Sequence, residues 1–434
     1  MDPTLLSSLI LILMFVLLFC GMPIGFAMGL SAFVGTLLLI DAQAALSLLG
    51  QTAYDTAVTY NLSVVPMFVL MGYIAGNARL SEALYRACNA WLGHRRGGLA
   101  LATIGACGGF AAICGSSIAT AATMAQIALP EMRRYNYDDR LATGAVAAGG
   151  TIGILIPPSI IMVIYGLLTE TSISKLFLAG FLPGLLTVAG FMVTIAVMTR
   201  LDPRLGPPAA RATQRERLLV LRDVWGPAAL FLLVIGGLYL GVFSPTEAAG
   251  IGAVGALALS VLNRSFSRAM LSASLLDTVK TTAQIFTILI GAILFNNFLI
   301  LASMPTIVSG WITGLPLGKT AILLVIIGMY FILGCLLDSL AMILLTIPIV
   351  FPIVSALGYD PIWFGIIIVM VVELGLITPP IGMNVFVIKG IARDVPLYTI
   401  FRGVTPFIVA QIILIAVLIA FPEIALWLPS TMSQ

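Results

Sequence analysis

Long apolar runs separated by short polar segments dominate the pattern of this chain. Four of them, Leu5–Cys20, Leu176–Met198, Ala228–Val242 and Phe407–Ala420, contain no charged residue. A helix needs roughly 20 apolar residues to cross the hydrocarbon core of a bilayer, so such runs predict about ten to twelve spans if some are shorter re-entrant pieces. The pattern therefore predicts an all-α protein that crosses a lipid bilayer many times.

The composition supports this reading. Hydrophobic residues make up 60% of the 434 positions and charged residues only 9%. A soluble protein could not solvate so much apolar surface. The net charge of +3 is too small to indicate a nucleic-acid partner, and the placement of the charges instead carries information on topology.

One stretch of the sequence occurs twice without a gap. Nine residues recur 222 positions later. The first set is Ser117, Ala119, Ile127, Pro130, Tyr137, Asp138, Gly153, Pro157 and Pro158, and the second is Ser339, Ala341, Ile349, Pro352, Tyr359, Asp360, Gly375, Pro379 and Pro380. A duplication inside an apolar chain, with Gly/Pro interruptions at matching places, is typical of a secondary transporter whose binding site lies between the two copies.

Each copy begins with a segment that we expect to form a re-entrant helical hairpin. Residues 93–140 have basic flanks on both sides, so both ends should face the cytoplasm, and the helix breaker at Cys114–Ser117 suits a tip inside the membrane. Residues 318–360, with a tip at Leu337–Ser339, have few basic residues at either end. The second hairpin should therefore enter from the opposite face.

Each hairpin is followed by a span with a proline pair in its middle. These spans are Leu141–Leu168, broken at Pro157-Pro158, and Pro361–Ile391, broken at Pro379-Pro380. Two adjacent prolines remove two backbone donors and open the helix, which frees carbonyl groups and helix ends. We expect two hairpin tips and two broken helices to meet near the midplane.

Charge placement predicts the orientation of the remaining segments. The polar loop Arg200–Arg222 is the densest basic stretch and should lie in the cytoplasm. Two amphipathic stretches, Ser81–Trp91 and Ser265–Lys280, are too polar to span and should lie in the interface as arms that brace the moving part. A plain connecting helix is the alternative for each.

The residues at the tips and breaks suit a hard cation. Na⁺ prefers several neutral oxygen ligands, which Ser116, Ser117, Ser339 and Thr378 can provide together with nearby carbonyls. The five cysteines and one histidine show no metal-binding spacing. Asp338 and Glu373 are acidic groups at membrane depth, where such groups are often functional, although Asp338 can equally cap the second helix of its hairpin.

Several motifs resemble one transporter family over nearly the whole chain. They are Cys114-Gly115-Ser116-Ser117-Ile118-Ala119-Thr120, Gly153-Ile154-Leu155-Ile156-Pro157-Pro158-Ser159, Leu176-Phe177-Leu178-Ala179-Gly180-Phe181-Leu182-Pro183-Gly184 and the run from Glu373-Leu374-Gly375 through Thr378-Pro379-Pro380 to Asn384. The chain resembles the large membrane (permease) subunit of tripartite ATP-independent periplasmic (TRAP) transporters.

The resemblance implies an inverted-repeat fold of the ion-transporter superfamily and a transporter in place of an enzyme. It implies Na⁺-coupled import of a small organic acid, of the sialic acid or dicarboxylate kind, across the bacterial inner membrane by an elevator movement. It also implies two partners, a small four-helix membrane subunit and a periplasmic solute-binding protein. The small subunit should be encoded separately, since only about two spans fit before Gln51.

Two sets of site residues follow from the repeat and the resemblance. We expect the substrate to contact Ser116, Ser117, Thr120, Pro157, Pro158, Thr378, Pro379 and Asn384. We expect Na⁺ to be held by Ser116, Ser117, Gly153, Asp338, Ser339, Gly375 and Thr378, in two pseudo-symmetric sites that are each completed by the broken helix of the same copy.

The chain should alternate between scaffold and transport segments. Residues 1–94 form scaffold helices and the first arm, 95–170 the first hairpin and broken helix, 171–316 scaffold helices, the cytoplasmic loop and the second arm, 317–392 the second hairpin and broken helix, and 393–434 a terminal scaffold helix.

Two other functions remain open at this stage. A stand-alone anion transporter, coupled to Na⁺ or H⁺ and independent of a binding protein, has a similar architecture but fits the motifs less well. An intramembrane enzyme needs a paired acid or metal set at depth, which the sequence does not show.

Overall fold

The computed structural model describes residues 3–313 and 318–432, and every regular element in these two ranges is a helix. The first half contains α1 Pro3–Phe19, α2 Ile24–Leu39, α3 Ala42–Val58, α4 Val64–Asn77, α5 Leu80–Leu92, α6 Gly98–Cys114, α7 Ser117–Arg134, α8 Asp139–Leu155, α9 Ile160–Leu168 and α10 Ile173–Leu201. The second contains α11 Gln214–Tyr239, α12 Pro245–Leu262, α13 Arg268–Leu301, α14 Met304–Thr313, α15 Lys319–Gly334, α16 Ser339–Ala356, α17 Pro361–Gly375, α18 Met383–Ile391, α19 Leu397–Ala420 and α20 Glu423–Ser430. Short 3₁₀ turns cover Tyr60–Ser63 and Pro203–Leu205.

The duplication extends over almost the whole succession of helices. Moving the bounds of α7 along the chain by 222 positions gives the bounds of α16, and α6, α8, α9 and α10 match α15, α17, α18 and α19 in the same way to within a few residues. The same shift carries α1 and α2 onto α11 and α12, and α5 onto α14. The repeat seen in the motifs is therefore part of a duplication of about ten helices.

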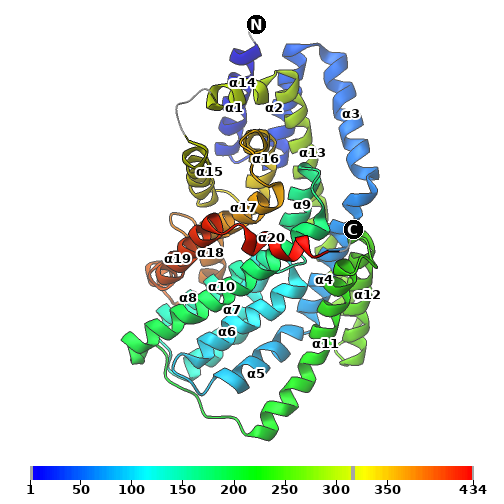
Figure 1. The fold of residues 1–434 in the computed structure, drawn as a ribbon. Coiled ribbons are helices and arrows are strands. Elements are labelled where there is room, and N and C mark those ends of the chain that lie inside the picture. Colours follow the sequence, from blue (N-terminus) through cyan, green and yellow to red (C-terminus); the bar gives the residue numbers. More distant parts are fainter. Residues whose placement is uncertain (1–2, 314–317, 433–434) are drawn as a thin grey trace.

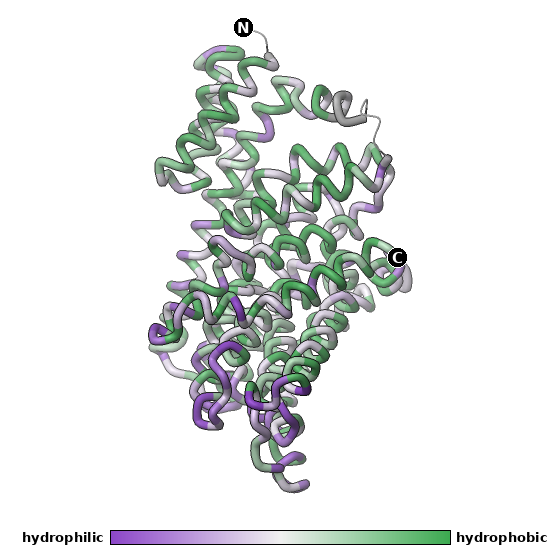
Figure 2. The backbone as a smooth tube through the Cα atoms, turned by 90° about the vertical axis from the view of Figure 1, so that its left-hand side faces the viewer, coloured by the Kyte–Doolittle hydropathy of each residue, from purple (hydrophilic) through white to green (hydrophobic). Residues whose placement is uncertain are grey.

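Six described helices are long and apolar enough to cross a membrane, or up to eight if each bent pair counts as one span. Shorter apolar helices, among them α6, α15 and α17, make up the rest of the apolar runs. The sequence expectation of about ten to twelve spans counted these shorter pieces. Figure 2 shows hydrophobic segments through most of the molecule and hydrophilic ones gathered at one end.

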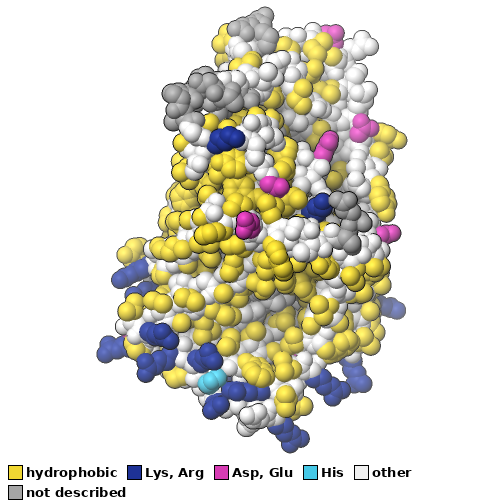
Figure 3. All heavy atoms as spheres, viewed as in Figure 1, with side chains coloured by type: hydrophobic (Ala, Val, Ile, Leu, Met, Phe, Trp, Pro, Cys, Tyr) yellow, Lys and Arg dark blue, Asp and Glu magenta, His cyan; other side chains and the backbone are white. Residues whose placement is uncertain are grey.

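Both hairpins and both breaks form where the sequence predicts them. α6 ends at Cys114 and α7 begins at Ser117, whereas α15 ends at Gly334 and α16 begins at Ser339. The proline pairs lie between α8 and α9, which are bent by 42°, and between α17 and α18. In Figure 1 the first hairpin lies in the lower half of the molecule and the second in the upper half, and Figure 3 shows most Lys and Arg side chains near the lower end.

The second predicted arm is wrong as a separate element. Residues Ser265–Lys280 mostly belong to α13, one continuous helix of 34 residues. Its counterpart in the first copy is bent by 58° between α3 and α4. The counterpart of the first arm, α5, is α14. Charges at the start of a long helix produced the same amphipathic pattern as an interfacial helix, so composition did not separate the two.

The polar loop is shorter than predicted. α10 continues to Leu201 and α11 begins at Gln214, so part of Arg200–Arg222 is helical. A capping box starts α11. The Thr213 hydroxyl accepts a hydrogen bond from the backbone N–H of Glu216, and the Glu216 carboxylate accepts one from the backbone N–H of Thr213. These reciprocal bonds fix the residue at which the loop ends and the helix begins.

α8 forms the centre of the lower part of the fold. Every residue from Leu141 to Leu155 is buried, and α6, α7, α10 and α19 surround the helix. A Cβ atom on Gly144 would overlap the carbonyl oxygen of Gly403 in α19, so the two backbones touch. The glycine row Gly144–Gly150 is thus an internal packing surface and holds α19 tightly to α8.

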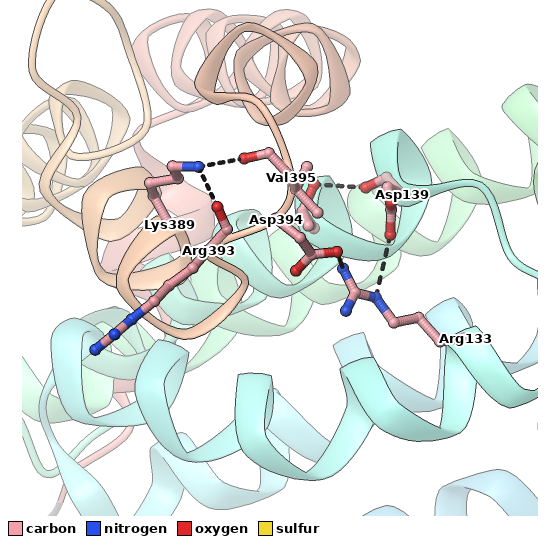
Figure 4. A network of polar contacts seen from close by, with 7 residues as sticks. Arg133, Asp139, Lys389, Arg393, Asp394 and Val395 are labelled. Carbon is pink, nitrogen blue, oxygen red and sulfur yellow. Dashed lines mark hydrogen bonds and ion pairs between the residues drawn. The ribbon is translucent and has the colours of Figure 1, made fainter.

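A charged network joins the end of the first hairpin to the second copy (Figure 4). Arg133, in the last turn of α7, donates to Asp394 at 2.7 Å and to Asp139 at 3.4 Å. Lys389 in α18 donates to the carbonyl oxygens of Arg393 and Val395, which fixes the loop that carries Asp394. Hydrogen bonding to Arg133 holds the pKa of Asp394 below its ordinary value.

Candidate functional site

The two hairpin tips lie together around one small cavity. This tip cavity has a volume of about 150 Å³ and includes Gly115, Ser116 and Ser117 from the first tip and Asp338 and Ser339 from the second. Ile154 and Leu376, from the ends of the two broken helices, also line it. Four of the predicted site residues, Ser116, Ser117, Asp338 and Ser339, therefore share one space.

The first tip rests directly on the break of its own copy. Gly115 ends α6 with φ of +65°, and a Cβ atom there would lie 2.6 Å from the carbonyl oxygen of Pro158. A Cβ atom on Gly153 would lie 2.7 Å from the carbonyl oxygen of Ser116 and 2.7 Å from the hydroxyl of Thr120. Only glycine fits at both places, because the backbone of the tip and the broken helix are in contact.

Ser116 and Asp338 occupy equivalent positions and both cap helices. The Ser116 hydroxyl accepts the backbone N–H of Ala119 at 3.4 Å, and the Asp338 carboxylate accepts that of Leu340 at 3.2 Å. The capping role that was an alternative for Asp338 is confirmed, and Ser116 has the same role in the first hairpin. Both side chains also line the tip cavity, so capping and exposure to that cavity occur together.

Ser117 makes a contact that crosses between the copies. Its hydroxyl donates to the Glu373 carboxylate in α17 at 2.5 Å, and both side chains are at most 2% exposed. The other oxygen of Glu373, Oε1, has no hydrogen-bond partner among the described residues. Sequence reasoning noted Glu373 but left it out of the site, since nothing in the spacing indicates a contact across 256 positions.

The second tip packs on its own broken helix through glycine as well. A Cβ atom on Gly375 would overlap the carbonyl carbon of Gly334, which ends α15. The Ser339 hydroxyl is buried and has no partner in the described part of the chain. The expectation that each tip lies near the repeated glycine of its own copy, Gly153 or Gly375, thus agrees with these contacts, and Glu373 adds a link between copies.

The other predicted substrate residues are distributed around this centre. Thr120 is buried with an unpartnered hydroxyl beside Gly153. Asn384 donates to the Ala147 carbonyl at 3.4 Å, and its own amide oxygen has no described partner. Thr378 donates to the Leu374 carbonyl at 2.6 Å, so its hydroxyl is used within its own segment.

The two breaks differ in exposure. Pro157 and Pro158 are buried beneath the first tip, whereas Pro379 and Pro380 are exposed. The second break therefore lies on the surface of this chain, while the first break is covered by protein.

A second and larger cavity lies between the first hairpin, α4 and α13. It has a volume of about 360 Å³, and its polar lining consists of Tyr73, Asn77, Ser116, Thr123, Gln126, Asp277 and Thr281. Tyr73 hydrogen-bonds Thr281 at 2.8 Å, and Asn77 donates to Ser274 at 2.9 Å. Sequence reasoning missed all of these except Ser116, although polar side chains in the apolar helix α4 were an available signal.

A larger hollow lies elsewhere and has a different character. It has a volume of about 860 Å³ between α2, α3 and α13, and apart from Thr287 its lining residues are apolar or glycine. With so few polar groups to fix a small acid or a cation, it does not qualify as the site.

The donor set of the tip region fits an alkali cation better than a transition metal. Buried oxygen atoms of Thr120, Ser339 and Glu373 lack partners there, and hard cations bind such oxygens. No group of three or more His, Cys, Asp or Glu side chains that could hold a metal occurs in residues 3–313 and 318–432.

Comparison with known proteins identifies the family. The family model described as "Tripartite ATP-independent periplasmic transporter, DctM component" matches residues 11–424. The C4-dicarboxylate TRAP transporter large permease protein DctM of Pseudomonas aeruginosa is 38% identical over 379 residues, which cover 87% of this chain and 88% of that protein. The sialic acid TRAP transporter large permease protein SiaM of Vibrio cholerae is 32% identical and covers 95% and 96% of the two chains.

A solved structure supports the architecture. The YdaH transporter of Alcanivorax borkumensis, described as having an unusual topology, aligns with a TM-score of 0.65 over 89% of this chain and 91% of that one, at 15% sequence identity. At this identity the likeness concerns the fold alone. The sequence matches carry the assignment: the chain belongs to the family of TRAP transporter large permease subunits, and it is a multi-pass membrane transport protein.

Proposed function

We propose that this permease imports a small organic acid with Na⁺ across the bacterial inner membrane. A periplasmic solute-binding protein delivers the acid, and a small four-helix membrane subunit completes the complex in the bilayer. Family membership supports the class of transporter, and the meeting of the two tips supports the position of the site.

The single observation that carries Na⁺ coupling is the set of buried oxygens without partners at the tips. The hydroxyl of Ser339, the hydroxyl of Thr120 and Oε1 of Glu373 are desolvated, and leaving polar atoms unpaired costs free energy. A bound cation removes this cost. Ser116, Ser117, Gly153, Asp338, Ser339, Gly375 and Thr378 remain the proposed ligands, through side chains or carbonyls.

The names of the two relatives, C4-dicarboxylate and sialic acid permeases, favour a carboxylate substrate. Neither cavity at the first hairpin has a Lys or Arg among the described residues that line it. The carboxylate is therefore expected to bind helix N-termini, hydroxyls and the bound cation. On the side of the second copy, the unpartnered amide oxygen of Asn384 can contact the bound cation or accept a hydrogen bond from a hydroxyl of the acid, and the exposed Pro379 offers an apolar contact.

We propose an elevator movement in which both hairpins and both broken helices move as one body past α4, α5 and α11. The cavity of about 360 Å³ lies along this boundary. The close contact of Gly144 with Gly403 favours including α19 in the moving body. Gly72 in α4 is also in backbone contact with Cys114 of the first hairpin, so movement past α4 must break that contact.

The proposed orientation places the Arg200–Arg222 loop in the cytoplasm. Positive charge gathers at the corresponding end of the molecule, as expected from the positive-inside bias. In this orientation, the first hairpin enters the membrane from the cytoplasmic side and the second hairpin enters it from the periplasmic side.

Reconstitution tests the proposal. Proteoliposomes that contain the permease and its small subunit should accumulate labelled acid only with an inward Na⁺ gradient and added binding protein. Accumulation without the binding protein would favour a stand-alone anion transporter, and accumulation driven equally by a K⁺ gradient would contradict Na⁺ coupling.

A further inference from the structure

The Ser117–Glu373 contact joins the first hairpin to the second broken helix. Ser117 begins α7 in one copy, and Glu373 lies in α17 of the other, two positions before the predicted ligand Gly375. Ser117 also lines the tip cavity, so Glu373 lies directly behind its wall. This is a polar side-chain contact between the two copies at the centre of the proposed site.

Glu373 has no positively charged partner in residues 3–313 and 318–432. The ion pairs of the described residues do not include it, and they involve partly exposed side chains. A carboxylate buried without a counter-ion is very unfavourable, and one hydrogen bond from a hydroxyl does not compensate for lost hydration. The free Oε1 atom marks where a compensating positive charge is missing.

The two copies differ at this position. The equivalent of Glu373 in the first copy is Thr151, whose hydroxyl donates to the Ala148 carbonyl of its own helix at 2.7 Å. Thr151 is neutral and already has a partner. The carboxylate is therefore a feature of the second copy alone, which a purely structural role in the shared fold does not require.

We propose that Glu373 supplies the negative charge of a cation site that both copies build, with Ser117 as a neutral ligand beside it. The inference rests on the proposed Na⁺ coupling and deepens it. The cation at this site is held by a formal charge, whereas the pseudo-symmetric site near Gly153 relies on neutral oxygens. Binding of an alkali ion to Oε1 of Glu373 and to the hydroxyl oxygen of Ser117, beside their hydrogen bond, ties the first hairpin to α17.

The test is equilibrium stabilisation by Na⁺. The full chain, purified in detergent, is unfolded thermally in NaCl and in choline chloride at equal ionic strength. A ligand that binds only the folded state raises the midpoint as its concentration exceeds its Kd. We expect the wild-type midpoint to rise with Na⁺ and not with choline.

Glu373→Gln removes the charge and keeps the shape and the acceptor for Ser117. We expect the Na⁺ concentration above which the midpoint begins to rise to increase at least tenfold. Glu373→Asp keeps the charge and should recover part of the affinity. Thr151→Val, the matched control, should behave as the wild type. Ser117→Ala, which removes only a neutral ligand, should lower the affinity less than Glu373→Gln.

The outcomes separate this inference from the proposed function. If the Na⁺ affinity of Glu373→Gln lay within twofold of the wild-type value, the proposed role of Glu373 would be wrong and Na⁺ coupling would be unaffected. No Na⁺-specific stabilisation of the wild type would overturn both. If Glu373→Gln does not fold, the Na⁺ affinities of Glu373→Asp and Ser117→Ala are compared instead. A greater loss of Na⁺ affinity in Ser117→Ala than in Glu373→Asp would contradict the charged site.

Discussion

The carbonyl oxygen of Ser116 lies 2.7 Å from the position that a Cβ atom on Gly153 would occupy. The tip of the first hairpin and the broken helix of its copy are thus in backbone contact. Neither segment can move away without disturbing its own helix, because the contact is between backbone atoms.

Gly153→Ala is expected to displace the tip. Overpacking of this kind costs about 1–3 kcal/mol, so the melting temperature should fall and uptake should decrease strongly. Gly250→Ala is the control, since a Cβ atom there meets nothing within 4 Å. Equal melting temperatures for the two variants would show that the tip adapts to the added methyl group.

Ser117→Ala together with Ser339→Ala should weaken Na⁺-driven uptake. Each change removes a buried hydroxyl at the tip cavity, and losing a buried polar contact typically costs about 1–3 kcal/mol. The Na⁺ concentration for half-maximal uptake should therefore rise about tenfold or more. Thr199→Ala, at a buried threonine that bonds only its own helix, serves as the control. Unchanged Na⁺ dependence of the double variant would remove these serines from the site.

A disulfide between α5 and α6 tests the elevator movement. A Cβ atom on Gly105 lies 3.9 Å from the Cβ of Cys88, close to the usual spacing in a disulfide, so Gly105→Cys should form one with the native cysteine under oxidation. If α5 is fixed and the first hairpin moves, the oxidised protein should lose uptake and reduction should restore it.

Two controls support that experiment. Gly105→Ser has a similar size and cannot cross-link, and the reduced Gly105→Cys protein reports the effect of the substitution itself. Full uptake by a Gly105→Cys protein in which the disulfide to Cys88 has been verified would refute movement between α5 and the hairpin. A cross-link between residues 141–156, mostly in α8, and residues 228–242, mostly in α11, would be a poorer test of the movement. α8 is enclosed by other helices of the proposed moving body.

Cysteine labelling tests the opposed hairpins. With the five native cysteines replaced, single cysteines at Arg96 and Arg134 should react only from the cytoplasmic side, and those at Lys319 and Asp360 only from the periplasmic side. Reaction of the Arg96 and Arg134 positions from different sides would mean an ordinary crossing.

The Arg133–Asp394 pair should make stability depend on acidity. Hydrogen bonding lowers the pKa of Asp394 in the folded state below the ordinary 3.8, so its contribution is present above that value and is lost as the pH falls through the lowered pKa. Asp394→Asn should therefore be less stable than the wild type at pH 7 and equal to it in strong acid. The difference should be small and should shrink in high salt, since the carboxylate is exposed.

Thermal unfolding of four proteins measures this pair. Arg133→Ala, Asp394→Asn and the double variant form a cycle with the wild type, and Arg134→Ala is an additional control because its ion pair with Glu131 lies within α7. Additive effects of Arg133→Ala and Asp394→Asn at pH 7 would show that the pair does not couple the copies.

The sequence predicted the hairpins and breaks because Gly115, Pro157 and Pro379 interrupt helices by local geometry, which needs no tertiary information. The partner of Ser117 could not be predicted in the same way. Glu373 contacts Ser117 because the two copies pack against each other, and the spacing of residues along the chain does not predict that contact. The lining contributed by Tyr73, Asn77 and Asp277 was missed because these residues lie on α4 and α13, far along the chain from the motifs, although the polar side chains in the apolar α4 were a signal.

The unbroken α13 is too long to lie entirely inside the hydrocarbon core of a bilayer. Its 34 residues rise about 51 Å at 1.5 Å per residue, whereas the hydrocarbon layer is roughly 30 Å thick. A tilt that fitted the whole helix inside would exceed the usual range of about 0–40°. At least one end must therefore extend beyond the hydrocarbon layer. Asp277 and Thr281, in the first half of the helix, line the cavities at the first hairpin, so this part of α13 supplies polar groups at the depth of the hairpin tips.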